Sequence, residues 1–182
     1  CKLIAAVWES IHLFELASID NMSKLYVRRY LEKNLEEEIK KAARLHQNLN
    51  LIVLDIDNFK MCNEAYGYSL GDQVIKDIAD KIKDFISEED LAARYGGEKL
   101  VVLLPGKTKD EGQSIAEQMR EAIENMDIIS TEGDAVKITV SIGVSSFPEH
   151  GNTVEELIKS ADQALYKAKI EGKNKVILAG TD

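Results

Sequence analysis

The 182-residue chain has few of the residues that build disulfide-rich or membrane-spanning proteins. It contains two cysteines, Cys1 and Cys62, two prolines and 6% aromatic residues. Two cysteines predict no disulfide framework, and Cys62, within a helical pattern, is interpreted as a reduced packing residue. No apolar run is long enough to cross a bilayer and no signal-peptide pattern is present. We therefore expect no membrane contact by this segment and a cytoplasmic location, which includes the cytoplasmic part of a membrane-attached sensor.

Positive charge is also scarce. Lysine and arginine total 23 against 32 aspartate and glutamate residues, for a net charge of −9. This balance argues against nucleic-acid binding, which needs a basic surface, but it permits an anionic small molecule held by a few lysines and a metal. The composition, 45% hydrophobic and 30% charged, is typical of a globular domain with a short extension. Because the first residue is Cys1 rather than Met, we expect a piece of a longer protein.

Residues 1–18 are predicted to form an N-terminal signalling or linker helix, followed by one domain over residues 19–182. Ile4, Val7, Ile11 and Phe14 form one helical stripe. The stripe fits a coiled-coil seam that joins two chains, and it fits equally a helix that packs on its own domain.

The rest of the chain alternates helical and strand patterns. Two capping signals are predicted: Ser69, with Asp72 three residues later, and Thr153, with Glu156 three residues later. Gly96 and Gly97 predict a two-residue hairpin turn. This order predicts an α/β (α+β) sandwich with a mixed central sheet. The predicted elements are a helix over 23–47, a strand over 49–56, a helix from about 69, a hairpin over 91–105, a helix over 109–126, a strand over 137–147, a helix from 153 to 172 and a strand over 174–178.

Four residues carry candidate chemistry. Asp55 ends the buried strand, where it can bind a hard cation or accept backbone hydrogen bonds. Glu98 follows the glycines, either as a solvated shoulder or facing Asp55 across adjacent strands with a divalent metal between the two carboxylates. Lys169 and Lys173 lie at a helix end, either as favourable charges there or as phosphate clamps.

Four sequence blocks, in order, resemble the GGDEF family of diguanylate cyclases over about residues 20–182. The resemblance implies a palm-like mixed central sheet flanked by helices, similar to nucleotidyl cyclase catalytic domains. It also implies that two GTP molecules, one per domain of a homodimer, are joined into cyclic di-GMP with Mg²⁺ or Mn²⁺, under control of an upstream sensor domain. The blocks are LDIDNFKMCNEAYGYSLGD (54–72), ARYGGEKL (93–100), ITVSIGV (138–144) and ADQALYKAKIEGKNKV (161–176).

The resemblance implies a role for each matching residue. Asp55 and Glu98 are expected to be catalytic metal ligands, and Glu98 also to activate the attacking 3′-hydroxyl. The carbonyl of Ile56 is the third expected metal ligand. The remaining expected assignments are Asn63 and Asp72 for guanine, Phe59, Lys60, Lys169 and Lys173 for phosphate, and Gly96 and Gly97 for close approach of the backbone to the nucleotide.

The sequence departs from the family pattern at several positions. Its signature reads GGEKL, so that Lys99 reverses the charge of a usual Glu beside the expected metal. Lys24 and Val27 replace a usual Gly and Asn, Lys173 replaces a usual Arg, and Ser87 replaces the Arg of the product-inhibition motif, which is therefore expected to be absent. Two interpretations stay open: an active diguanylate cyclase, or a degenerate domain that binds GTP or a partner without turnover and serves regulation or dimerisation.

Overall fold

A six-stranded mixed sheet forms the middle layer of the computed structural model, which describes residues 18–130 and 132–181. Apart from Ser18, the predicted helix over residues 1–18 lies outside this range. The sheet order is β1-β3-β4-β2-β7-β8, with β1 parallel to β3, β7 parallel to β8 and the other pairs antiparallel. Its strands are β1 (Tyr26–Val27), β2 (Leu49–Ile56), β3 (Leu91–Gly96), β4 (Lys99–Pro105), β7 (Val140–Phe147) and β8 (Val176–Leu178).

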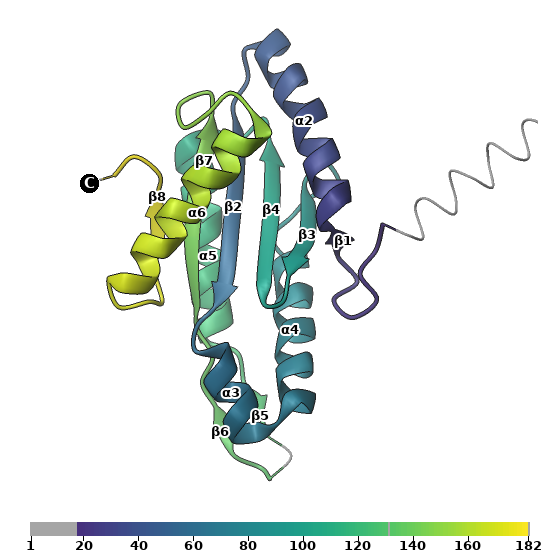
Figure 1. Cartoon of the computed structure of the whole chain (residues 1–182), viewed down its shortest axis with the longest axis vertical. Helices are drawn as coiled ribbons and strands as arrows, with labels where there is room; N and C mark the ends of the chain where they lie inside the picture. Colours follow the sequence, from purple (N-terminus) through teal and green to yellow (C-terminus); the bar gives the residue numbers. More distant parts are fainter. Residues whose placement is uncertain (1–17, 131, 182) are drawn as a thin grey trace, which may run out of the picture.

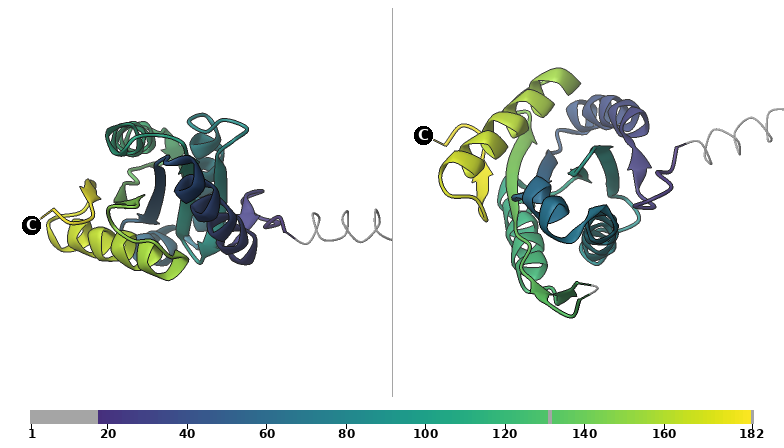
Figure 2. Two further views of the ribbon diagram at one scale, coloured as in Figure 1. Left: turned by 90° about the horizontal axis from the view of Figure 1, so that it is seen from above. Right: turned by 60° about the horizontal axis from the view of Figure 1, so that its bottom comes forward.

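Helices cover both faces of the sheet (Figures 1 and 2), which confirms the predicted mixed sandwich. Helices α2 (Arg28–Leu45) and α6 (Val154–Ile170) cover one face, and α4 (Tyr68–Lys83) and α5 (Lys109–Glu124) cover the other. A short helix, α3 (Phe59–Tyr66), follows β2 at the lower end in Figure 1, near a small hairpin of β5 (Ile128–Ile129) and β6 (Ala135–Val136). Because β2 is central and covered on both faces, its sequence is a continuous apolar run rather than an alternating one.

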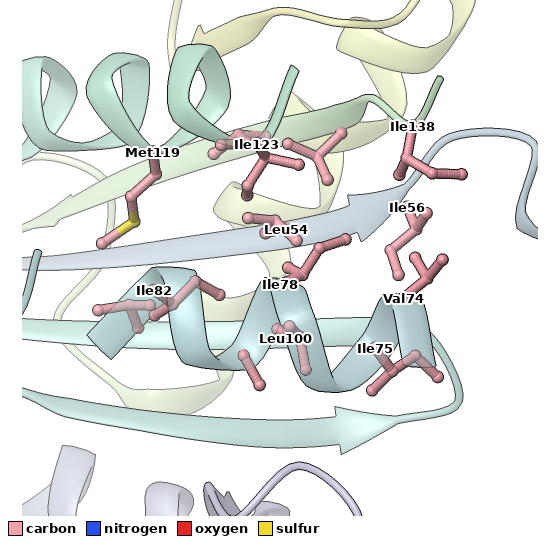
Figure 3. Packing of buried hydrophobic residues seen from close by; sticks show 14 of the residues in the cluster. Leu54, Ile56, Val74, Ile75, Ile78, Ile82, Leu100, Met119, Ile123 and Ile138 are labelled. Atoms are coloured by element: carbon pink, nitrogen blue, oxygen red, sulfur yellow. The ribbon is translucent and has the colours of Figure 1, made fainter. Parts of the chain in front are cut away.

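Alternate residues of β2 enter two separate cores. Ile52, Leu54 and Ile56 face α4 and α5, where they pack with residues such as Ile78 and Met119 (Figure 3). Leu51 and Val53 face α2 and α6. This alternation fixes the direction of every side chain on β2, including that of Asp55 near its end.

Helix α6 lies unusually close to the sheet at Gly143 of β7. A Cβ atom placed on Gly143 would lie 2.0 Å from the carbonyl oxygen of Ala161 and 2.4 Å from the backbone nitrogen of Leu165. No side chain fits in that space, so glycine at this position allows α6 to pack directly on the strand.

Several predicted boundaries differ from the structure. The first described helix begins at Arg28 rather than at 23, because Tyr26 and Val27 pair with β3 as a short edge strand. The predicted Ser69 cap is wrong: α4 begins at Tyr68, and Gly67 takes the N-cap position because its φ of +83° suits the turn out of α3. Helix α3 and the hairpin β5–β6 were not predicted as separate elements.

The predicted cap of the last helix is confirmed in part. The Thr153 hydroxyl accepts from the Glu156 backbone N–H at 3.2 Å. The Glu156 carboxylate accepts from the backbone of Asn152 rather than from that of Thr153. The reciprocal capping box is found instead at α5, between Thr108 and Glu111.

We expect Ile78→Ala to lower the free energy of unfolding by about 2–5 kcal/mol, because it leaves a cavity in a fully buried core. Lys76→Ala, on the exposed side of the same helix, is the control and should change it by no more than about 0.5 kcal/mol. Urea unfolding followed by circular dichroism measures both. Equal small effects would contradict the packing of α4 described here.

Candidate active site

One lysine joins the acidic residues at the end of β2. Asp55 shares the face of Leu51 and Val53, so its side chain points toward the layer of α2 and α6. The Lys169 ammonium, near the end of α6, donates to Asp55 Oδ1 and lies 3.3 Å from the Ile56 carbonyl oxygen. Its Nζ also lies 3.4 Å from Asp57 Oδ1. Three oxygens from the strand end therefore share one cation.

Asp57 is the most buried acidic residue of this cluster, with its side chain 1% exposed. Its carboxylate accepts from the hydroxyls of Thr139 at 2.8 Å and Ser141 at 2.7 Å, and from the Asn174 backbone N–H at 3.0 Å. These bonds tie together the end of β2, the start of β7 and the loop after α6. Asp57 was assigned no role from the sequence, although its spacing of two from Asp55 is a signal that both side chains share one face.

Burial raises the pKa of the Asp55 carboxyl, and the hydrogen bond and charge of Lys169 oppose that rise. The negative charge of Glu98 raises the pKa further, whereas the positive charge of Lys99 lowers it. Both hairpin residues therefore lie close enough to act on Asp55. A cation at this position favours the ionised carboxylate, which is the form that binds metals.

The β3–β4 turn places Glu98 differently from the prediction. Gly96 pairs with Lys99, so the two-residue turn is Gly97-Glu98 rather than Gly96-Gly97. The cross-strand partner of Asp55 is Lys99, so the prediction that Glu98 faces Asp55 directly across the strands is wrong. The shift arises from an irregularity between Arg94 and Gly96.

Arg94 is hydrogen-bonded to the turn between β3 and β4. Its Nε donates to the Gly97 carbonyl at 2.9 Å, and its Nη1 lies 3.3 Å from Asp20 Oδ1. That oxygen of Asp20 also accepts from the backbone N–H and the hydroxyl of Ser23. The segment before β1 is thus linked to the turn that carries Glu98.

Lys99 turns toward α6. Its Nζ lies 2.8 Å from Asp162 Oδ1, with the two side chains 30% and 39% exposed. Asp55 is bonded instead to Lys169. Asp162 lies within the quoted block ADQALYKAKIEGKNKV but was assigned no role from the sequence.

The expected phosphate-binding residues lie around the start of α3. Phe59 and Lys60 are its first two residues, after Asn58 in a left-handed conformation with φ of +55°. Lys173, in the loop after α6, places its Nζ 2.5 Å from Asn58 Oδ1. The Lys60 side chain points to solvent, 3.6 Å from Glu64. Lys169, Lys173 and the first backbone N–H groups of α3 are therefore neighbours of one loop.

The expected guanine-binding residues lie on the neighbouring helices α3 and α4. Asn63 Oδ1 is buried and has no hydrogen-bond partner within the described residues. A Cβ on Gly71 would lie 1.9 Å from that oxygen, so glycine there makes room for the Asn63 amide. Asp72, the next residue, is exposed. A small hollow of ≈ 270 Å³ opens beside α3, lined in part by Asp57, Asn58 and Cys62.

At two departures from the family pattern, the local structure favours the residue that is usual in the family. Lys24 has φ of +56°, a left-handed conformation that favours the usual Gly, and its side chain is exposed. Val27 occupies the N-cap of α2 without a side-chain cap, the place where Asn would be favoured.

Ser87 and Asp90, at the position of the product-inhibition motif, bond to each other. Asp90 Oδ2 accepts from the backbone N–H and hydroxyl of Ser87 at 2.8 and 2.7 Å. Its other oxygen lies 2.5 Å from the Lys107 Nζ. Both oxygens of Asp90 therefore have partners within the domain.

No group of three or more His, Cys, Asp or Glu residues within residues 18–130 and 132–181 forms a preassembled metal site. Nor does any helix in this described range combine the length and apolar character needed to cross a bilayer. Asp55, the Ile56 carbonyl and Glu98 are the oxygen donors that could hold a cation, with further ligands from water or a substrate.

The chain matches known proteins over most of its length. The family model described as "Diguanylate cyclase, GGDEF domain" matches residues 17–175. The uncharacterized protein YhcK of Bacillus subtilis is 38% identical over 161 residues, which cover 88% of this chain and 45% of that protein. The response regulator PleD of Caulobacter vibrioides is 34% identical over 167 residues, covering 91% and 37%. The chain spans less than half the length of these relatives.

The fold also matches solved structures. The GGDEF domain of DgcB from Caulobacter crescentus, in complex with c-di-GMP, superposes with a TM-score of 0.86 at 29% identity, covering 91% of this chain and 97% of that one. Family match, curated relatives and fold agree, and the chain belongs to the diguanylate cyclase GGDEF domain family.

Proposed function

We propose that this domain condenses two GTP molecules into cyclic di-GMP with the help of a divalent cation, Mg²⁺ or Mn²⁺. One observation carries the proposal. Two oxygen donors and two cations lie around the end of β2 and the start of α3: Asp55, the Ile56 carbonyl, Lys169 and Lys173. The charge of Glu98, in the adjacent turn, acts on the Asp55 carboxylate.

The donors at the end of β2 suit a hard cation. The Asp55 carboxylate and the Ile56 carbonyl already share the Lys169 ammonium, so these two oxygens can serve one positive charge. Mg²⁺ is usually held by one or two carboxylates together with water and substrate phosphates, and Glu98 supplies the second carboxylate. A divalent ion held there would polarise the phosphates and lower the pKa of the attacking hydroxyl.

The phosphates would lie between the ends of α6 and α3. Lys169 can exchange its bond to Asp55 for a phosphate oxygen when a divalent ion takes its place. Lys173 adds a second positive charge beside Asn58. The first N–H groups of α3 have no acceptors within the helix and can donate to a phosphate, as helix N-termini commonly do.

Asn63 and Asp72 would select guanine. The exposed Asp72 carboxylate can accept from the ring N–H and the amino group of guanine, and adenine offers no matching pair of donors. Asn63 adds an amide whose position is fixed by the space at Gly71.

Each reaction step forms one phosphorus–oxygen bond and breaks another. The 3′-hydroxyl of one GTP would attack the α-phosphorus of the other, the bond from that phosphorus to pyrophosphate would break, and Glu98 would accept the hydroxyl proton. Two such steps close the ring and release two pyrophosphates. Because each domain holds one GTP, two chains must face each other. Residues 1–18 are proposed as the linker helix from a cytoplasmic or membrane-attached sensor that brings residues 19–182 of two chains together.

Lys99 favours a second candidate function. Its backbone pairs with that of Asp55, so its ammonium could approach this carboxylate and weaken the binding of a divalent cation there. The domain would then bind GTP or a partner without turnover and act as a regulatory or dimerising module.

We expect purified protein, incubated with GTP and Mg²⁺, to form cyclic di-GMP and pyrophosphate in a ratio of one to two, measured by chromatography and a phosphate assay. The rate per chain should rise with protein concentration because two chains must meet. Glu98→Gln should lower the rate by about 100-fold or more, since it removes a charge that acts on the reacting groups. The control is Glu89→Gln, which changes an exposed acid just before β3 and should leave the rate unchanged. GTP binding without product would favour the regulatory module.

We expect Asp72→Ala to weaken the affinity for GTP by about 30-fold, corresponding to about 2 kcal/mol for lost hydrogen bonds to a charged group. Calorimetry with a GTP analogue that carries carbon in place of the α,β-bridging oxygen measures binding without turnover. Asp80→Ala, which removes the same charge from the exposed side of the same helix, is the control and should bind as the unchanged chain does. Equal affinities of the unchanged chain for GTP and ATP analogues would contradict the assignment of guanine recognition.

We expect Lys169→Met to lower the free energy of unfolding by about 2 kcal/mol, because Asp57 and Asp55 lose their shared cation in a largely buried place. Mg²⁺ should restore more stability to this variant than to the unchanged chain, since a bound ion stabilises the folded state. The control is Lys167→Met, two residues away, because in the described structure the Lys167 ammonium contacts only the Thr181 carbonyl and Glu171. Urea unfolding with and without Mg²⁺ measures both effects, and an equal Mg²⁺ response in all three proteins would contradict the cation site.

A further inference from the structure

The backbone of Lys99, the lysine of the GGEKL signature, lies next to the proposed metal ligands. Lys99 on β4 is the cross-strand partner of Asp55 on β2. Side chains at paired positions leave the sheet on the same face, with Cβ atoms about 5 Å apart. A flexible four-carbon stem could therefore carry the ammonium over the Asp55 carboxylate, into the place proposed for a divalent ion.

The structure shows a different arrangement. Lys99 Nζ lies 2.8 Å from Asp162 Oδ1 on α6, and Asp55 is bonded to Lys169 of the same helix. Asp162 and Lys169 are seven residues apart, which is close to two helical turns, so they lie along one face of α6. The helix thus supplies an anion for the signature lysine and a cation for the strand-end carboxylate.

Arg28, which lines the same groove as Asp162, has partners of its own. Arg28 donates to Glu32 at 2.8 Å and stacks over the ring of Tyr95, with its Cζ 4.4 Å from the ring centroid. The Tyr95 hydroxyl donates to the same Glu32. These residues and Asp162 line a groove of ≈ 730 Å³ between α2 and α6. Lys99 is therefore the cation paired directly with Asp162.

The Lys99–Asp162 pair contributes little as an ordinary salt bridge. About a third of each side chain is exposed. Exposed pairs of this kind add little to the free energy of unfolding because water and salt screen them. The pair matters for where it holds the ammonium rather than for how strongly it joins two elements.

We propose that Asp162 is a positioning residue that holds the Lys99 ammonium away from the space between Asp55 and Glu98, so that this chain keeps a divalent-cation site despite a lysine in its signature. The inference rests on the proposed function and deepens it. It explains how a chain with GGEKL can share the chemistry of the family. It also makes Lys99 and Asp162 one coupled unit rather than a defect and an unrelated surface acid.

The test is a double-mutant cycle on metal affinity rather than on turnover. Mn²⁺ binding is measured by electron paramagnetic resonance for the unchanged chain, Asp162→Asn, Lys99→Met and the double variant, each with the nonreacting GTP analogue. We expect Asp162→Asn alone to weaken Mn²⁺ binding by roughly tenfold, the effect of a unit charge about 6 Å from a divalent ion in water. In the Lys99→Met background the same change should have a much smaller effect, because no ammonium is released toward the metal site and only the charge of Asp162 itself is lost. Asp162→Glu should restore the affinity, and Glu155→Gln, an acid of the same groove, should leave it unchanged.

Every other result of this mutant cycle overturns the proposal. An unchanged affinity in Asp162→Asn would show that Lys99 does not need to be held. An equal loss in both backgrounds would assign Asp162 a structural role unrelated to the lysine. Mn²⁺ binding by Lys99→Met but not by the unchanged chain would show that the lysine is not withdrawn, and binding by neither would remove the metal site and both proposals. Affinities that follow the cycle in a chain without turnover would overturn the proposed reaction and leave this inference standing.

Discussion

The arrangement of the site depends on one buried electrostatic constraint: carboxylates at the end of a central strand must be paired with a positive charge. Asp57 is almost fully buried and Asp55 largely so, and both lie within reach of the Lys169 ammonium. Without that cation, two desolvated negative charges would lie side by side at considerable cost. The end of α6 is therefore held against the end of β2 by charge as well as by packing.

The same constraint explains why the residues of the candidate active site come from distant parts of the chain. Asp57 accepts hydrogen bonds from Ser141 of β7, from Thr139 just before β7 and from Asn174 in the loop after α6. Each bond satisfies a group that burial would otherwise leave without a partner. The resulting frame places the loop between β2 and α3 beside Lys173, and places the β3–β4 turn beside Asp55. In the proposed reaction this frame would hold the nucleotide before any chemistry begins.

Much of this could be predicted from the sequence, because the informative patterns are local. The apolar run of β2 and the helical stripes predict the sandwich, and the position of Asp55 at the end of a buried strand marks it as a cation ligand or an acceptor of backbone hydrogen bonds. The resemblance locates Lys169 and Lys173, which lie together at the loop before α3. The roles of the individual residues are proposals that the geometry supports.

The errors arise where the backbone conformation between two elements, or a contact with a distant residue, decides the structure. Ser69 has the side chain of a cap, but Gly67 is used because the chain must turn sharply out of α3. The irregularity before Gly96 moves the turn by one residue and puts Lys99, not Glu98, opposite Asp55. The partners of Asp57 and Lys99 lie 63 to 117 residues away in sequence, so no local pattern could reveal them.

Gly143 has a mechanical consequence. Because α6 lies in direct contact with β7 at this point, the helix cannot move closer to the sheet there. Asp162 and Lys169 are spaced along α6 by about 10.5 Å of helical rise, so a displacement of the helix as a rigid body would carry both charges together. Such a displacement would change the partner of the strand-end acid and the partner of the signature lysine at the same time.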